Sequence, residues 1–373
     1  MPEPTARPAL QRRAVLYADR PPIARSTRDC RYNHALFSPE YKSCAMSVLP
    51  VSPAHIDLAV AALRDGQLIG MPTETVYGLA ADADNPAAVR AIFALKGRPA
   101  DHPVIVHIAG AQQLDQWAQE IPDAAWRLAE AFWPGPLTLI LPRQPHVPDA
   151  VTGGQDTVGL RAPSHPAAQA LLQQFGGGLA APSANRFGHV SPTTAQHVHD
   201  EFGDALPIVL DGGACDVGVE STIVGLAAGA PTLLRPGGIS REAIQDLLGL
   251  QLQHHKKADT AKVRVSGLLD SHYSPRTPLI TGAPERVNDQ ARLAFERGER
   301  VALITCGPAA PTRGIDQAAL AAEPAEYARQ IYDTLRQLDR GHYQAIYLQL
   351  PPATPAWLAV HDRLHRAAHT RLG

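Results

Sequence analysis

Two cationic side chains, Lys96 and Arg98, stand in the short text Lys-Gly-Arg-Pro and could together hold a phosphate group. Arginine offers a planar fork that matches phosphate oxygens, whereas lysine acts as a point charge. Earlier in the chain, an apolar run at residues 68–71 predicts a short buried strand, and the polar residues 73–77 follow it directly. Ligands bind at the carboxyl ends of strands in open α/β sheets. The pattern therefore predicts a phosphate site beside this strand end, although cations at a helix end also suit the helix dipole.

The elements that would position these groups alternate between strands and helices. Asn85 and Pro86 predict a helix start, and Gly97 predicts its end just before Pro99. Short apolar runs predict further strands at 103–108, 137–141, 158–160, 179–181, 208–210, 222–224 and 233–234. Apolar residues at helical spacing predict helices near 52–66, 114–117, 124–132, 167–174 and 194–202. Such alternation is typical of an α/β or α+β sheet domain.

Several polar residues within apolar text are further candidates for a binding site. Arg161 stands between Leu160 and Ala162, and a buried arginine without a ligand would be a costly unpaired charge. His107 alternates within the strand predicted at 103–108 and fits either a ligand contact or a hydrogen-bonded core histidine. Ser and Asn in the text Pro-Ser-Ala-Asn at 182–185 fit either a nucleotide contact or an ordinary turn.

Composition indicates a soluble globular protein. The 373 residues suggest two domains on a prior of ~150 residues each, and 45% apolar with 19% charged residues is ordinary. A net charge of −2 gives no overall basic field for nucleic acid. The four cysteines are isolated, which argues against a zinc ribbon or a disulfide framework and favours a reducing, cytoplasmic location. No apolar run approaches ~18 residues, so no membrane contact is expected.

The chain divides into four predicted regions. Residues 1–47 are rich in Arg and Pro without apolar periodicity, which predicts a disordered or non-native extension. Residues 48–249 hold the alternating elements and form the predicted catalytic domain. Residues 250–278 are polar and predict a linker. Residues 279–373 predict a small α/β domain without a catalytic constellation.

Several motifs in a fixed order carry a resemblance to a known family. The texts PTETVYGLAADA and IFALKGRPADHPVIVHI are followed by FWPGPLTLIL, DTVGLRAPSHP, LAAPSANRFGHVSPT, DGGACDVGVESTIV and LLRPGG. Over residues 52–240 the sequence resembles the YrdC-type threonylcarbamoyl-AMP synthases. The texts at 271–275 and 360–368 resemble the longer, two-domain (Sua-type) form. This likeness implies that the linker at 250–278 acts as a lid over the active site, and that the C-terminal domain supports the lid or positions RNA. The resemblance implies a twisted mixed sheet around a deep concave site, plus a small Rossmann-like C-terminal α/β domain.

This resemblance implies a nucleotidyltransferase. The expected reaction converts L-threonine, bicarbonate and ATP into threonylcarbamoyl-AMP and pyrophosphate, for the threonylcarbamoyladenosine modification of tRNA. ATP is then a substrate, magnesium is expected with it, and no structural metal is assigned. The implied partners are a downstream tRNA threonylcarbamoyl-transferase complex and, through a local patch, tRNA or other RNA.

Matching each family motif to this sequence assigns the site residues. Catalysis is assigned to Lys96, Arg98, Ser183 and Asn185. ATP binding is assigned to Arg98, His102, Thr157, Ser183, Ser191, Arg235 and Tyr273. Threonine binding is assigned to Thr75, His107, Arg161, Ser221 and, through its backbone, Ala181.

The carboxylate of Glu74 and the imidazole of His102 are two positions where the role is less direct. Glu74 fits either a general base or a magnesium ligand, and the sequence leaves this choice open. The chain has His102 where the family usually has asparagine, so a matched nucleotide contact falls on a side chain that titrates near pH ~6.5. Residues 266–270 also depart from the usual lead-in to the linker motif.

Two other functions share the same fold-level signals. A non-catalytic RNA-binding module would use the same concavity and would bind RNA with a steep salt dependence. A carbamoyltransferase of the hydrogenase-maturation type shares the core fold, but normally carries zinc-finger regions, and this chain has no Cys-x-x-Cys pair. The threonine-side residues Arg161 and Ser221 favour the synthase, because RNA binding alone would not require them.

Overall fold

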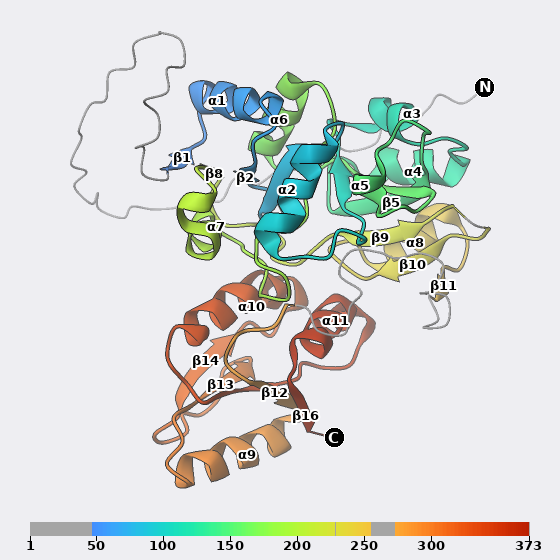
Figure 1. The fold of residues 1–373 in the computed structure, drawn as a ribbon. Coiled ribbons are helices and arrows are strands. Elements are labelled where there is room, and N and C mark those ends of the chain that lie inside the picture. The colour runs from blue at the N-terminus through green and yellow to red at the C-terminus, as the bar shows by residue number, and fades with distance from the viewer. Residues whose placement is uncertain (1–46, 228, 255–272, 373) are drawn as a thin grey trace, which may run out of the picture. The chain divides into compact units, whose positions relative to one another are not determined.

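The structure is a computed structural model that describes residues 47–227, 229–254 and 273–372. Residues 45–373 form one compact unit with an 11-stranded and a 5-stranded sheet (Figure 1). The predicted N-terminal extension, apart from Ser47, and most of the predicted linker, including His272, lie outside the described residues. None of the helices that the structure describes is long and apolar enough to cross a membrane.

The larger sheet is mixed and has the strand order β1-β8-β2-β3-β7-β4-β6-β5-β9-β10-β11. Its strands are β1 (Ser47–Pro50), β2 (Ile69–Met71), β3 (Gly78–Asp82), β4 (Ile105–His107), β5 (Leu137–Pro142), β6 (Thr157–Arg161), β7 (Leu179–Ala180), β8 (Ile208–Asp211), β9 (Thr222–Gly225), β10 (Thr232–Arg235) and β11 (Gln253–His254). In the parallel pair β4 and β6, His107 lies opposite Arg161. The register thus places two predicted threonine-side residues next to each other.

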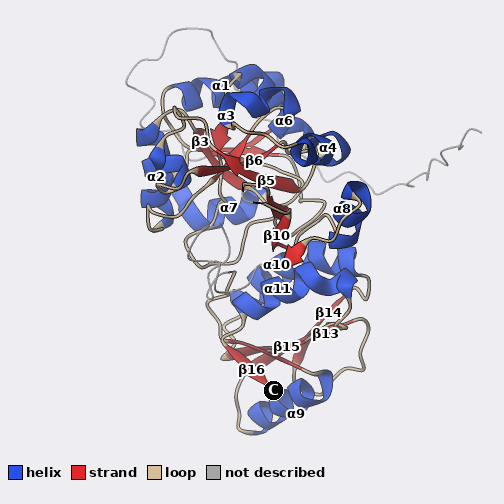
Figure 2. Cartoon of the chain, turned by 90° about the vertical axis from the view of Figure 1, so that its right-hand side faces the viewer, coloured by secondary structure: helices blue, strands red, loops and turns tan. Residues whose placement is uncertain are grey.

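Helices cover both faces of this sheet (Figure 2). The helices are α1 (Pro53–Arg64), α2 (Pro86–Lys96), α3 (Leu114–Trp117), α4 (Asp123–Phe132), α5 (Asp149–Thr152), α6 (Pro166–Phe175), α7 (Ala195–Phe202) and α8 (Arg241–Leu248), with short 3-10 turns at Ala111–Gln113 and Gly203–Ala205. Successive side chains of a strand point to opposite faces. On β3, Ala80 therefore packs with α1 and α6, whereas Leu79 and Ala81 pack with α2, α3 and α4.

The smaller sheet is parallel and has the order β14-β13-β15-β12-β16. Its strands are β12 (Leu279–Gly282), β13 (Val301–Cys306), β14 (Asp316–Leu320), β15 (Ala345–Gln349) and β16 (Thr370–Leu372). Helix α9 (Pro284–Glu296) packs against one face of this sheet. Helices α10 (Pro324–Asp339) and α11 (Leu358–Ala367), the latter preceded by a 3-10 turn at Pro355–Trp357, pack against the other face.

One hydrophobic cluster contains residues from both the larger-sheet part and the smaller-sheet part of the chain. Val76, Val190 and Val219 come from loops of the larger-sheet part and are buried together with Ile331 and Leu335 of α10. Burial of apolar side chains contributes roughly 25 cal/mol for each Å² removed from water. The two parts are therefore joined by a common core as well as by the chain.

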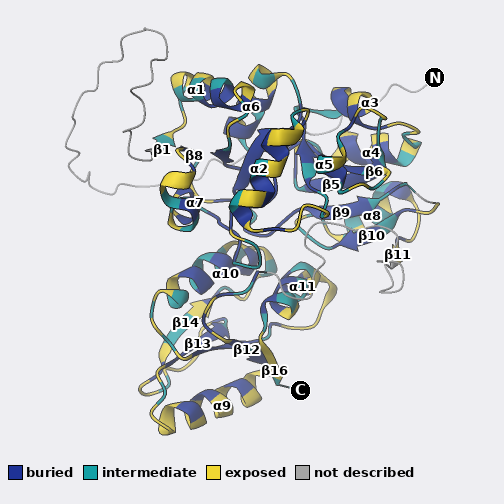
Figure 3. Ribbon diagram, viewed as in Figure 1, coloured by how far each residue is buried: buried dark blue, intermediate teal, exposed yellow. Residues whose placement is uncertain are grey.

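Helix α2 forms where its sequence predicts it. The Asn85 side chain accepts hydrogen bonds from the backbone N–H groups of Ala87 and Ala88, and Pro86 occupies the first turn. Gly97 ends the helix in the left-handed conformation, with φ of 63°. The helix shows one buried and one exposed side (Figure 3). Its last residue, Lys96, lies on the buried side.

The prediction of a mixed sheet in an α/β fold with a second, small α/β domain is confirmed, and the sheet of the second domain is parallel. Strand β3 was not predicted, because Gly78–Asp82 contains no β-branched or aromatic residue and follows a polar segment. Helix α9 was not predicted either, because its sequence PERVNDQARLAFE is mostly polar and buries only Val287, Ala291 and Ala294.

Candidate active site

Most of the predicted threonine and ATP residues line one small cavity. It is lined by Thr73, Thr75, Val76, Gly78, Ile105, His107, Arg161, Ala181, Pro182, Ser183, Glu220, Ser221, Arg235 and Tyr273. The five predicted threonine residues are all in this set, together with Ser183, Arg235 and Tyr273 of the predicted ATP set. The cavity volume is about 40 Å³, whereas pockets for nucleotide-sized ligands occupy roughly 300–1,000 Å³. The lining side chains would have to separate to admit a ligand of that size.

A buried ion pair holds the predicted threonine anchor. Arg161, at the end of β6, donates from Nη2 to Glu74 Oε1 over 2.6 Å, and both side chains are 5% exposed. The other Glu74 oxygen accepts from the backbone N–H of Ser164 at 3.0 Å. Arg161 Nε has no hydrogen-bond partner among the described residues. This cation is held by a carboxylate on one side and has an unused donor that could bind an anionic ligand.

The same contacts narrow the role of Glu74. Both of its oxygens accept hydrogen bonds, from Arg161 and from the Ser164 amide. A magnesium ion prefers carboxylates whose charge is not already balanced by a buried cation. This arrangement does not fit Glu74 as a magnesium ligand. The described residues also contain no group of three or more His, Cys, Asp or Glu side chains arranged around a common point.

His107 lies beside the anchor as a neutral imidazole. Burial, followed by the positive charge of Arg161, lowers its pKa to about 3. The side chain is 2% exposed, and Nδ1 has no hydrogen-bond partner within the described part of the chain. A neutral imidazole with an unused nitrogen at the cavity wall can donate to or accept from a hydroxyl group.

Arg235 and Ser221 form the opposite wall. The Ser221 hydroxyl lies 2.8 Å from the hydroxyl of Thr138 on β5. Arg235 donates to the Ser221 carbonyl from Nε at 3.1 Å and from Nη2 at 3.0 Å, and to its hydroxyl at 3.1 Å. A register shift between Leu233 and Arg235 interrupts the pairing of β10 with β9. Such an irregularity re-aims a side chain, and here it accompanies an arginine at the cavity wall.

Lys96 approaches the site from the end of α2. Its Nζ donates to the carbonyl oxygens of Ser183 at 2.5 Å and Asn185 at 2.6 Å. Burial, followed by the charge of Arg98, lowers the pKa of Lys96 well below its usual value. The Asn185 side-chain amide donates to the carbonyls of Arg186 and His189, so it braces the same turn. Residues 182–185 therefore form a turn, as one of the two alternatives predicted, and this turn also supplies the carbonyl oxygens that hold Lys96.

Four of the predicted ATP residues are not among the residues that line the cavity: Arg98, His102, Thr157 and Ser191, whose hydroxyl donates to Glu220. Arg98 donates to the Pro103 carbonyl at 2.9 Å and lies 5.6 Å from the centre of the Phe93 ring. Burial lowers its pKa to about 10. His102, in the adjacent loop, has its ring 6.0 Å from that of Phe187. Thr157 begins β6 and lies at the opposite end of that strand from Arg161.

Glu220 lines the cavity and was not assigned from the sequence. Its Oε1 accepts from the Ser191 hydroxyl at 2.6 Å, and its Oε2 accepts from the Tyr332 hydroxyl at 3.1 Å and from Arg363 Nε at 2.6 Å. Burial raises its pKa, but Arg363, Arg235 and these hydrogen bonds lower it overall to about 2. The only sequence signal was an acidic residue inside the text Val-Gly-Val-Glu-Ser, beside the predicted Ser221.

Tyr273 closes the cavity on the side of the smaller sheet. Its ring is stacked on that of Tyr332 at 5.9 Å, and its side chain is 1% exposed. Its φ of 66° is in the left-handed region, which is uncommon for residues other than glycine. Burial and then the charge of Glu220 raise its pKa to about 12, so its hydroxyl stays protonated.

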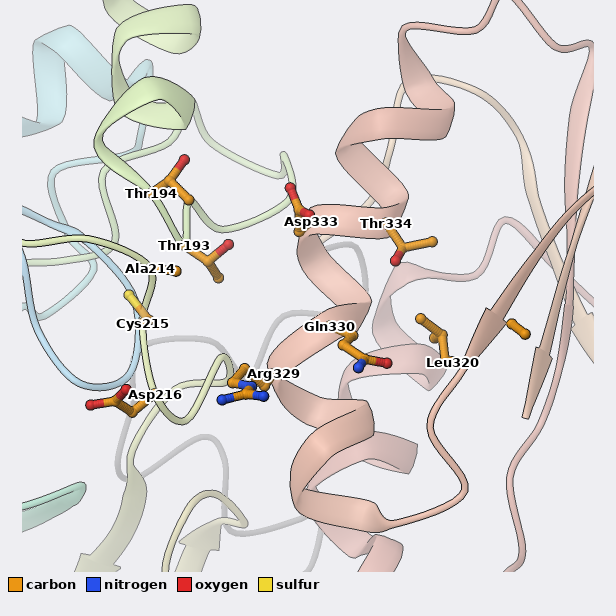
Figure 4. A pocket seen from close by; sticks show the side chains of 11 residues that line it. Thr193, Thr194, Ala214, Cys215, Asp216, Leu320, Arg329, Gln330, Asp333 and Thr334 are labelled. Carbon is orange, nitrogen blue, oxygen red and sulfur yellow. The ribbon is translucent and has the colours of Figure 1, made fainter. Parts of the chain in front are cut away.

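A second cavity, of about 460 Å³, lies between α10 and loops of the larger-sheet part. Figure 4 shows Arg329 and Asp333 of α10 on the side of the loops that carry Asp216 and Thr193. His197 contacts Asp333 at 3.1 Å and lies beneath this surface. None of the predicted site residues lines it. The candidate active site is therefore the smaller cavity.

Comparison with protein families divides the sequence in two. Residues 61–237 match the family described as Telomere recombination. Residues 239–369 match the family described as Threonylcarbamoyl-AMP synthase, C-terminal domain.

Individual relatives match along nearly their whole length. A threonylcarbamoyl-AMP synthase of Pyrococcus abyssi is 39% identical over 85% of this chain and 95% of its own length. One of Bacillus subtilis is 38% identical over 87% of this chain and 96% of its own length. The crystal structure of P. abyssi Sua5 complexed with L-threonine has a TM-score of 0.80 and 36% identity, and it covers 87% of this chain and 98% of that chain.

Proposed function

Since this chain belongs to the two-domain threonylcarbamoyl-AMP synthase family, we propose that it makes threonylcarbamoyl-AMP from L-threonine, bicarbonate and ATP. The supporting observation in the structure is a single cavity that combines Arg161, held by Glu74, with Arg235 and Ser221 on the facing wall. Such a cavity offers separate cations to a carboxylate and to a polyphosphate.

The proposed chemistry has two steps. The threonine amine attacks bicarbonate and forms a carbamate with loss of water. A carbamate oxygen then attacks the α-phosphorus of ATP, the bond to the β-phosphate oxygen breaks, and pyrophosphate leaves. Phosphoryl-centre reactions depend mainly on positioning and on stabilising negative charge. The residues of this chain therefore act as holders of substrates and charge.

We assign the threonine side as follows. Arg161 binds the carboxylate through the donor that Glu74 leaves unused. His107 and Thr75 bind the hydroxyl or amine, since both are buried at the cavity wall. Ser221 and the Ala181 backbone complete this side.

The ATP side consists of the remaining cations and small polar groups. Lys96 and Arg235 neutralise the triphosphate, and Ser183 and Asn185 form the turn that brings Lys96 to it. Arg98, His102, Thr157, Ser191 and Tyr273 remain proposed nucleotide contacts. Lys96 now donates to two carbonyls, so it must exchange those acceptors for phosphate oxygens. Magnesium would accompany ATP as an ion held by the phosphates, and it would add positive charge there.

Region boundaries and partners belong to the same proposal. We divide the described chain into a catalytic domain at 48–249, a linker at 250–278 and a C-terminal domain from 279. The product is a reactive mixed anhydride, so its consumption requires an amine acceptor. We propose that a tRNA threonylcarbamoyl-transferase complex uses it to modify tRNA in the cytoplasm.

The test measures pyrophosphate release from ATP by the purified full chain, with and without L-threonine and bicarbonate. We expect release that depends on both, and loss of at least about 100-fold in Lys96→Ala and Arg161→Ala, since each removes a charge that contacts substrate. Arg90→Ala, at an exposed position of α2, is the matched control and should retain wild-type rates.

The opposite result would identify the alternative function. A folded protein that releases no pyrophosphate with threonine, yet binds RNA with an affinity that falls steeply with salt, would be an RNA-binding module. Release that continues unchanged in Arg161→Ala would contradict the assignment of the threonine side.

A further inference from the structure

A single arginine of the C-terminal part reaches the wall of the candidate active site. Arg363, on α11, is 1% exposed. It donates from Nε to Glu220 Oε2 at 2.6 Å, from Nη2 to the Glu220 carbonyl at 3.2 Å, and from Nη1 to the Pro236 carbonyl at 2.9 Å. Pro236 directly follows Arg235, and Glu220 directly precedes Ser221. One guanidinium group therefore fixes the backbone beside two residues of the cavity wall.

The Glu220 carboxylate is the centre of this arrangement. It lines the cavity and accepts the Ser191 hydroxyl, so its position also sets that of a predicted ATP residue. The Tyr332 hydroxyl of α10 donates to the same oxygen as Arg363. Arg363 also lies 5.5 Å from the centre of the Tyr273 ring, which is stacked on Tyr332. Two helices of the C-terminal part thus surround one carboxylate of the catalytic part.

The Glu220 carboxylate places a negative charge at the wall of the cavity, and Arg363 is the cation paired with it. ATP and threonine both carry negative groups, and a carboxylate facing their cavity would repel them unless a cation balanced it. The neighbouring cation is Arg235, whose charge already acts on Glu220. If Arg235 had to balance Glu220, less of its charge would be available to the triphosphate. Asp362 accepts from Arg363 Nη1 at 2.7 Å and from Arg366 Nη2 at 3.0 Å. Arg366 therefore shares in balancing Asp362, while Nε of Arg363 stays on Glu220 at 2.6 Å.

We propose that Arg363 is a positioning residue of the synthase site, which balances Glu220 from behind and so keeps Arg235 and Ser191 available to ATP. This inference rests on the proposed function, and it gives the C-terminal part a specific role. That part supplies the positive charge of Arg363. Without it, the Glu220 carboxylate would lie at the substrate cavity without its ion-pair partner.

The test combines substitution of Arg363 with removal of the Glu220 charge that Arg363 balances. Arg363→Met should raise the Michaelis constant for ATP about tenfold, the scale of a lost contact between close charges. Glu220→Gln in the same chain should return this constant to within about threefold of wild type, because a neutral amide needs no counter-charge. Arg363→Lys should lie between, since one nitrogen replaces three donors. Arg286→Met, at an exposed position of α9, is the control.

Thermal unfolding separates positioning from packing. All rates are measured well below the melting temperature of every variant, which is recorded in parallel. If Arg363→Met leaves the ATP constant unchanged, the proposal is overturned. The same holds if Glu220→Gln restores the melting temperature of Arg363→Met but not its ATP constant. If Arg363→Met does not fold, the comparison of Arg363→Lys with its Glu220→Gln double variant decides in the same way.

Failure of the proposed function has a different signature. A wild-type protein without threonine-dependent pyrophosphate release would contradict the synthase assignment whatever the variants do. Binding of ATP by calorimetry then tests Arg363 independently of turnover. Weaker binding in Arg363→Met, restored by Glu220→Gln, would support the positioning role, and equal binding in all variants would overturn it.

Discussion

Two buried ion pairs flank the same cavity with opposite polarity. In the first, Arg161 lines the cavity and Glu74 lies behind it; in the second, Glu220 lines the cavity and Arg363 lies behind it. Both have a nitrogen–oxygen distance of 2.6 Å. The first pair presents a cation to an anionic ligand. The second presents an anion, Glu220, which would repel that ligand if Arg363 did not balance its charge.

The pairs also differ in how far apart their members lie in the sequence. Glu74 and Arg161 both belong to the catalytic part, 87 positions apart. Glu220 and Arg363 are separated by 143 positions and come from the two different parts of the chain. If Arg363 balances Glu220 as we propose, a complete site in this molecule needs one charge from each part.

The largest effect should come from breaking the first pair. Arg161→Met removes the proposed carboxylate anchor and leaves Glu74 buried without a cation, which costs about 3–5 kcal/mol of unfolding free energy. Urea unfolding measures this loss, and calorimetry should detect no threonine binding. Arg64→Met, on the surface side of α1, controls for the loss of an arginine side chain. Normal threonine affinity in a destabilised Arg161→Met would show that the pair is structural only.

The second pair should contribute to unfolding in acid. The pKa of Glu220 is lowered from its usual 4.5 to about 2, and that of Glu201 is also about 2. Because a depressed carboxylate pKa stabilises the folded state only while the group is ionised, this contribution is complete above pH 4.5 and is lost as the pH falls toward 2. We expect a loss of a few kcal/mol, on the order of 1.4 kcal/mol per pKa unit.

Glu220→Gln should flatten this part of the acid profile, as followed by urea unfolding at a series of pH values. A separate decline should begin higher, because His107 has its pKa lowered to about 3 and the unfolded chain takes up that proton below about 6.5. An acid profile that Glu220→Gln leaves unchanged would mean that Glu220 does not carry the expected charge coupling.

A smaller effect distinguishes the two carboxylates. Glu74→Gln keeps an acceptor for Arg161 or the Ser164 amide but leaves the buried Arg161 without its counter-charge, at a cost of about 2–3 kcal/mol. Glu220→Gln should cost more, because Glu220 accepts from Ser191, Tyr332 and Arg363. Urea unfolding of both variants at pH 7 compares them. Equal costs would show that the number of donors does not matter here.

The smallest effect should appear at His102, outside both pairs. If this side chain contacts ATP, protonation of its imidazole adds a pH dependence to the Michaelis constant for ATP. His102→Asn should remove that dependence and change the constant at pH 8 only slightly. Identical pH profiles in the two proteins would remove His102 from the ATP site.

Residues whose environment is local could be predicted from the sequence itself. Asn85, Gly97 and Lys96 lie on one helix, and their capping and burial follow from spacing alone. Arg161 was expected to be buried because its sequence neighbours are apolar, and it is 4% exposed. The sequence left Glu74 undecided, because its partner is fixed by the pairing of distant strands.

Glu220 could not be assigned for the same reason. Its environment is made by Tyr332 and Arg363, which the chain brings back only after the second sheet has formed. A lone glutamate in an apolar motif indicated burial but not the partner. Strand β3 and helix α9 were missed because tertiary packing, rather than their own composition, holds them in place.

The shared hydrophobic cluster has a consequence for how this protein unfolds. Val76, Val190 and Val219 complete a core whose other members, such as Ile331, belong to α10. If the C-terminal part melted first, it would expose these valines and leave the Glu220 carboxylate buried without its cation. Loss of structure in either part therefore destabilises the other, and we expect heating to produce a single cooperative transition with equal calorimetric and van't Hoff enthalpies.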